Sequence, residues 1–113
     1  MVQIVRVYSG TDGESHFEDL TPDQLAEIVG NLGEGDITLN QRQYNDQSPT
    51  YHNAPRLQYV IHIAGVSEYE VADGTVRRLI AGDVLVAEDM TGHGHIARIV
   101  TEDYRCTLGI PMK

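Results

Sequence analysis

The chain is poor in cysteine, in long apolar runs and in any leader-like segment. Cys106 is the only cysteine among 113 residues, so no disulfide can form within the chain. No apolar stretch approaches the roughly 18 residues that a membrane-spanning helix requires. The first ten residues, MVQIVRVYSG, lack the long apolar run and the small-residue cleavage site of a signal peptide. We therefore expect a cytoplasmic protein.

Basic residues are also scarce. Eight Lys and Arg stand against seventeen Asp and Glu, for a formal net charge of −9, and Lys113 is the only lysine. No base lies between Arg6 and Arg42, whereas eight acids do. Such a chain repels polyanions, so nucleic acid and anionic membrane surfaces are not expected as partners.

The residues that are present favour one soluble all-β domain over residues 1–113. Apolar residues make up 41% of the chain and charged residues 22%, as in ordinary globular domains. One short helix is predicted over 21–28, where Thr21 can cap and Pro22 suits the first position. Alternating or apolar stretches between turn residues predict strands at 2–8, 36–43, 57–64, 67–71, 75–80, 83–87, 95–101 and 104–110. Residues 45–55 read as a loop, and this set indicates a β-sandwich or a closed barrel.

The segment 57–64 is informative because neither of its faces is wholly polar. One face carries Leu57, Tyr59 and two isoleucines, and the other carries Gln58, Val60 and His62. We therefore expect the strand to be buried on both sides. Gln58 and His62 then either satisfy each other and the backbone inside a core, or line a polar pocket inside a barrel.

Two of the five histidines stand two residues apart. In an extended segment His93 and His95 point to one face and can bind a metal ion together. Gly92 and Gly94 make a turn equally compatible with the sequence, and a turn directs only one of the two imidazoles inward.

The second half of the chain resembles the cupins, a superfamily of small β-barrels. The first cupin motif has the form G-x5-H-x-H-x3,4-E-x6-G. The chain matches it at His52 and Gly65, but Ala54 replaces the second histidine and Gln58 the glutamate. The stretch DGTVRRLIAGDV resembles the hairpin and turn that precede the second motif. The stretch AEDMTGHGH resembles the loop that supplies that motif's histidine, which is His95 here.

One subgroup of small cupins is a closer match. The stretches YHNAPRLQ (residues 51–58) and AEDMTGHGH (87–95) resemble its two characteristic segments, and GESHFED (13–19) resembles its N-terminal one. The resemblance implies a small jelly-roll-like β-barrel. Residues 1–43 would supply N-terminal strands and the helix, and residues 44–113 the motif core. Fold carries over between such relatives better than function does.

The resemblance also implies a site for a divalent transition metal such as Fe, Mn, Ni, Cu or Zn. The matching positions offer His52, Gln58 and His95, a neutral set that lacks the usual carboxylate. His62 is expected as pocket wall or general base, and His93 as a further imidazole or proton-transfer group. Glu88 and Asp89 can supply a carboxylate, although acids in loops are usually solvated.

Two classes of function remain open. The first is a metal-dependent oxygenase, isomerase or lyase that acts on a small molecule. The second is a non-catalytic binding or sensor protein with a degraded metal site. In either case Arg56, Gln58 and Tyr59 are the expected contacts to the ligand. The site positions are neutral with Arg56 alongside, so a small anion can enter a chain that repels large ones.

Small cupins commonly form dimers, so the resemblance implies a homodimer. The N-terminal segment 2–8 is the expected edge strand for such contact.

Overall fold

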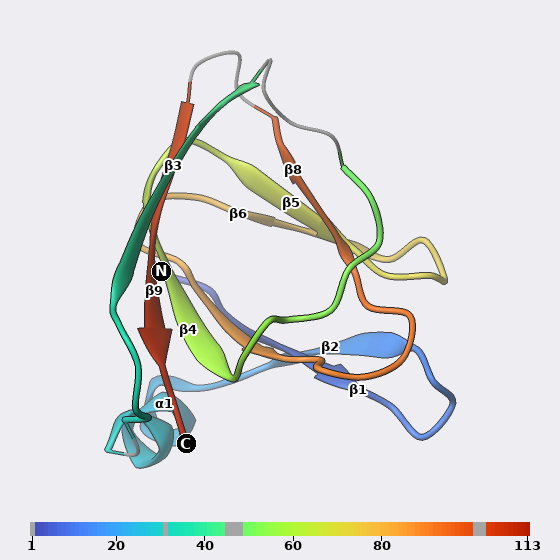
Figure 1. The fold of residues 1–113 in the computed structure, drawn as a ribbon, viewed down its shortest axis with the longest axis horizontal. Helices are drawn as coiled ribbons and strands as arrows, with labels where there is room; N and C mark the ends of the chain where they lie inside the picture. The colour runs from blue at the N-terminus through green and yellow to red at the C-terminus, as the bar shows by residue number, and fades with distance from the viewer. Residues whose placement is uncertain (1, 31, 45–48, 101–103) are drawn as a thin grey trace.

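The structure is a computed structural model that describes residues 2–30, 32–44, 49–100 and 104–113. Two sheets and one short helix make up the fold (Figure 1). The larger sheet has the order β2 (Ser15–Asp19), β1 (Ile4–Ser9), β7 (Val84–Glu88), β4 (Gln58–Ala64), β9 (Tyr104–Pro111) and β3 (Thr38–Gln43). The smaller sheet has the order β6 (Val76–Leu79), β5 (Ser67–Glu70) and β8 (Ile96–Ile99).

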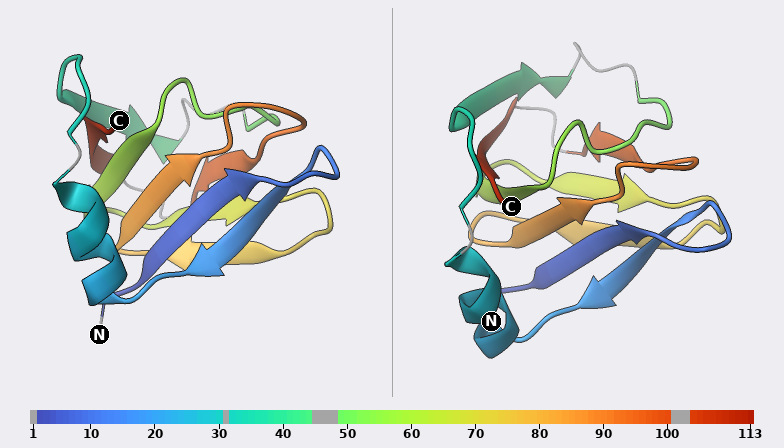
Figure 2. Two further views of the ribbon diagram at one scale, coloured as in Figure 1. Left: turned by 90° about the horizontal axis from the view of Figure 1, so that it is seen from below. Right: turned by 60° about the horizontal axis from the view of Figure 1, so that its bottom comes forward.

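The prediction of a mostly β protein with one short helix is confirmed. In Figure 2 the smaller sheet lies across one face of the larger sheet. No ladder between the described strands joins the two sheets into a closed barrel, so the cupin jelly roll remains a prediction. No helix among the described residues is long and apolar enough to cross a bilayer.

Two apolar clusters hold the layers together. The first fills the space between the sheets and includes Val5 and Leu85 of the larger sheet and Tyr69 of the smaller one. The second covers the outer face of the larger sheet, where Leu25 of the helix packs against a cluster that includes Tyr59. The helix thus packs on the outer face, whereas on the inner face part of the first cluster also lines a pocket.

The helix α1 (Pro22–Val29) begins where the capping box predicted. The Gln24 backbone N–H donates to Thr21 Oγ1 over 3.2 Å, and the Thr21 backbone N–H donates to Gln24 Oε1 over 2.8 Å. This reciprocal pair satisfies two backbone donors that the first turn leaves unpaired. The predicted helix start is thus confirmed.

The prediction that the N-terminal segment is an edge strand is wrong. β1 pairs with β2 on one side in the antiparallel direction, and with β7 on the other side in the parallel direction. The edge belongs to β2, a strand that the sequence did not predict because Ser15–Asp19 has no alternating apolar pattern. Pairing with β1 supplies its backbone with the hydrogen bonds that its side chains do not promote.

The expectation that β4 is buried on both sides holds only in part, because two of its seven residues are buried, four are half-buried and one is exposed. Tyr59 and His62, on opposite faces, are both buried at 2% exposure. Ile63, near the end of the strand, departs from the prediction and is 46% exposed. The predicted loop at 45–55 is described from residue 49 onward, and residues 45–48 lie outside the described part of the chain.

Candidate functional site

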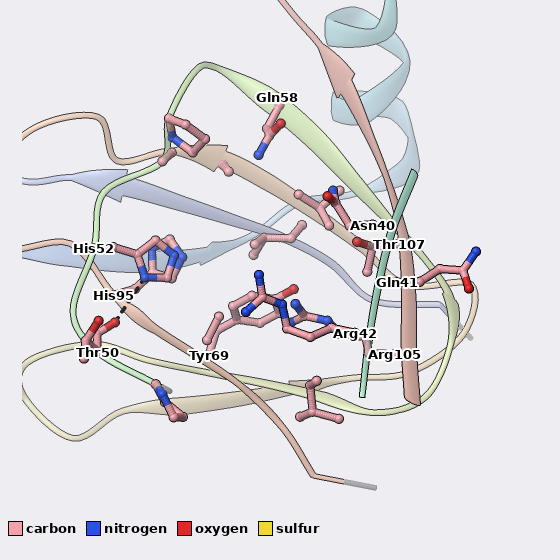
Figure 3. Close-up of a pocket in the computed structure, with 18 residues that line it drawn as sticks. Asn40, Gln41, Arg42, Thr50, His52, Gln58, Tyr69, His95, Arg105 and Thr107 are labelled. Atoms are coloured by element: carbon pink, nitrogen blue, oxygen red, sulfur yellow. Dashed lines mark hydrogen bonds between the residues drawn. The ribbon is translucent and has the colours of Figure 1, made fainter. Parts of the chain in front are cut away.

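A pocket of about 490 Å³ opens between the two sheets (Figure 3). Its apolar wall comes from inward-facing residues of both sheets, including Val60, Leu85, Ala97 and Ile99. Its volume falls within the range of pockets that bind small organic molecules. The polar groups that line it include Arg42, His52, Gln58, Tyr69, His95 and Arg105.

His52 and His95 face each other across an isolated antiparallel bridge. Each backbone N–H donates to the other residue's carbonyl oxygen over 2.9 Å. Residues paired in this way project their side chains to the same side. The two imidazole rings consequently lie 4.7 Å apart, centre to centre, and both line the pocket.

Both imidazoles use Nδ1 as a donor. Nδ1 of His52 lies 3.1 Å from the Thr50 carbonyl oxygen, and Nδ1 of His95 lies 2.6 Å from Asp89 Oδ2. A carbonyl oxygen and a carboxylate can only accept, so the proton of each neutral ring is on Nδ1. Each Nε2 then carries a lone pair and makes no hydrogen bond within the described residues.

Asp89 is the deepest polar group behind the site. It is fully buried and also accepts a hydrogen bond from Ser15 Oγ over 2.6 Å. Its Oδ1 atom is buried with no hydrogen-bond partner among the described residues. The sequence suggested Asp89 as a loop acid, but the structure uses it to orient His95.

Gln58 also lines the pocket, whereas its neighbour Arg56 does not. Arg56 Nε donates to Gln58 Oε1 over 3.0 Å, and its other nitrogens donate to the carbonyl oxygens of Asp36 and Gly109. Arg56 therefore holds the Gln58 amide in position from outside the pocket lining. The Gln58 oxygen keeps a second lone pair for a ligand.

The structure places His62 and Tyr59 outside the pocket lining. His62 Nδ1 donates to the Asp83 carbonyl oxygen over 2.9 Å, and its Nε2 lies 2.7 Å from the Tyr69 hydroxyl group. Burial lowers the pKa of His62, which keeps the ring neutral. Tyr69 thus stands between His62 and the pocket, and Tyr59 belongs to the core under the helix.

His93 also lies away from the pocket. Its ring stacks on Tyr51 with the centres 4.1 Å apart, and its Nδ1 lies 2.9 Å from a carboxylate oxygen of Glu14. The side chain is 44% exposed. Of the two conformations that the sequence allowed for this segment, the structure has the turn, in which only His95 faces inward.

The sequence did not indicate seven further polar residues of the pocket lining: Asn40, Gln41, Arg42, Thr50, Tyr69, Arg105 and Thr107. Alternation along the predicted strands was the available signal, because it separates the two faces of each strand. It does not tell which strands are neighbours, so it did not bring the two arginines together.

Comparisons with family models, with curated proteins and with solved structures found no match to this chain. The cupin resemblance therefore rests on the sequence stretches alone.

Proposed function

We propose that the protein is a cupin-like enzyme that acts on a small molecule with the help of a divalent transition metal. His52 and His95 would hold the metal through Nε2, and Gln58 would be a third donor or an adjacent hydrogen-bond partner. One observation carries this proposal: both rings donate Nδ1–H to a fixed acceptor and keep Nε2 free. Histidines that bind metals are oriented in this way by carbonyl or carboxylate partners.

The donor set fits such a metal, though it carries no charge. Imidazole nitrogen suits Zn, Cu, Fe and Ni. The described residues contain no cluster of three His, Cys, Asp or Glu side chains, so the third protein donor would be the Gln58 amide. When bound, the metal would polarise a substrate oxygen as a Lewis acid. Asp89 would keep the His95 ring in position, and the apolar wall would limit the access of water.

A binding or sensor protein is the second candidate. It is favoured by the absence of any Asp or Glu from the part of the pocket lining that the structure describes. Without ligand charge to offset the cation, metal affinity falls. Oxygenase, isomerase and lyase reactions belong to the first candidate, and simple ligand capture belongs to the second.

Metal binding by the purified protein distinguishes the two. We expect wild type to bind about one Zn²⁺ or Mn²⁺ per chain in calorimetric titrations. Both His52→Ala and His95→Ala should lower the affinity by at least about tenfold, since loss of even an outer partner commonly costs 10–100-fold.

His93→Ala is the matched control, because this exposed imidazole lies outside the pocket lining. It should leave the affinity unchanged. A wild-type protein that binds no metal, or histidine variants that bind it as well as wild type, would contradict the metal-dependent function.

A further inference from the structure

Two arginines face each other directly on the strands that close one side of the pocket. Arg42 of β3 pairs with Arg105 of β9 in the antiparallel register, and the next inward pair is Asn40 with Thr107. All four residues line the pocket. Like charges directly opposite each other destabilise a sheet, so this pair is unfavourable for the pairing of β3 with β9.

Neither arginine has a partner for its charge among the residues that the structure describes. Within the described residues, the other five arginines donate to carboxylate, amide or carbonyl oxygens, as Arg6 does to Glu88 and Arg98 to Glu70. Arg42 and Arg105 make no such bond. Nε of Arg105 is moreover buried without a hydrogen-bond partner in the described part of the chain. A buried donor left unpaired costs free energy, which a bound anion would recover.

Both arginines reach the pocket, Arg105 from a half-buried position and Arg42 from the exposed edge strand. Burial lowers the pKa of His62, and the positive charge of Arg105 lowers it further. Burial raises the pKa of Tyr69, and the Arg105 charge opposes part of that rise. Figure 3 shows the side chains of Arg42 and Arg105 extending toward Tyr69, with His52 and His95 beyond. None of the described residues that line the pocket is acidic, although the chain carries seventeen acids. A chain with a net charge of −9 therefore encloses a cationic pocket.

We propose that Arg42 and Arg105 form a subsite for the carboxylate group of a small organic molecule. Two planar guanidinium groups match the two oxygens of a carboxylate through paired N–H···O bonds. The apolar wall suits the carbon skeleton of the ligand. The only helix that the structure describes covers the opposite face of the larger sheet, so the pocket has no helix N-terminus of the kind that favours phosphate.

This subsite adds a substrate class to the function proposed above. The chemical reaction of the bound acid rests on that proposed function, whereas the binding of its carboxylate does not. A ligand anchored by its carboxylate at the β3–β9 side directs its remaining atoms toward His52, Gln58 and His95. The subsite consequently names the class of substrate as a small organic acid. The subsite stands even if the histidines hold no metal.

The test uses metal-free protein, dialysed against a chelator, so that a carboxylate cannot bind through a metal. Succinate and benzoate are titrated while backbone amide NMR signals are followed. We expect saturable shifts at residues 105, 107 and 95. Arg42→Gln and Arg105→Gln should each weaken this binding at least about tenfold. Arg105→Lys should weaken it less, because lysine keeps the positive charge but lacks the paired donors of the planar guanidinium group.

Arg78→Gln is the matched control, since this exposed arginine pairs with Glu68 away from the pocket. It should bind as wild type does. Both pocket variants should also melt no lower than wild type, because each removes a repulsion between like charges. The proposal is overturned if neither acid gives saturable shifts, if benzamide or inorganic phosphate binds as well as the acids, or if the pocket variants retain wild-type affinity.

Discussion

The five histidines illustrate how neighbouring groups decide the role of one residue type. His16 lies beside Asp12 at the surface, and His93 stacks on an exposed tyrosine. His62 is enclosed between a backbone carbonyl and a tyrosine hydroxyl group, whereas His52 and His95 keep one ring nitrogen free toward a ligand. Only the last two combine an oriented ring with a place in the pocket lining.

His62 makes stability depend on pH. Burial lowers its pKa in the folded state below the usual 6.5, so the unfolded chain takes up the proton first. The stabilisation is complete above pH 6.5 and is lost as the pH falls from there toward the folded pKa. One proton changes the free energy of unfolding by up to about 1.4 kcal/mol per pH unit.

His62→Gln should remove this dependence. Urea unfolding between pH 8 and pH 5 should show a variant that is less stable at pH 8 but loses less stability on acidification than wild type. His93→Gln, at an exposed site, should keep the wild-type slope. Equal slopes in wild type and His62→Gln would show that His62 does not titrate differently in the folded and unfolded states.

At the scale of elements, the candidate site depends on a two-residue bridge rather than on a long strand. Gly94 lies immediately before His95 with φ +84°, and a Cβ there would overlap the carbonyl oxygen of His52. The same carbonyl accepts the His95 backbone N–H. Only glycine permits this close approach, so Gly94 controls the spacing of the two imidazoles.

Gly94→Ala should therefore destabilise the protein and disturb the site. We expect a loss of more than about 2 kcal/mol of unfolding free energy, from the left-handed backbone strain together with the overlap. Gly74→Ala is the control, because its φ of +89° is similar but nothing lies within 4 Å of the added carbon. It should cost only about 1 kcal/mol. Equal losses in urea unfolding would exclude the role of the close approach.

At the scale of the whole molecule, the two edges of the larger sheet differ in character. The β2 edge carries the exposed acids Glu18 and Asp19, which disfavour pairing between copies. The β3 edge is exposed at every residue, and Ile37 and Leu39 are 66% and 57% exposed. We propose that the expected homodimer uses the β3 edge, in place of the N-terminal strand.

Light scattering coupled to size exclusion should then give twice the 12.5 kDa mass of one chain. Leu39→Glu should shift the population toward the monomer, because it places a charge on this edge. Ile80→Glu, at an exposed turn away from β3, should leave the mass unchanged. A wild-type protein of 12.5 kDa would contradict the homodimer.

Local patterns in the sequence were sufficient for much of this molecule. The capping box located the start of the helix, and the period of two located most strands and the two faces of β4, because both depend on residues a few positions apart. They did not reveal β2, whose hydrogen bonds come from its neighbour rather than from its own side chains.

The sequence by itself determined the net negative charge and the mostly β character. It also indicated three residues of the candidate site, His52, Gln58 and His95. Only the tertiary structure decided that Asp89 orients His95, that His62 and His93 lie outside the pocket, and that Arg42 and Arg105 meet inside it. The physical reason is strand register. Which residues face each other across a sheet depends on pairing between segments far apart in the chain, and Arg42 and Arg105 are 63 positions apart. No local pattern encodes that pairing.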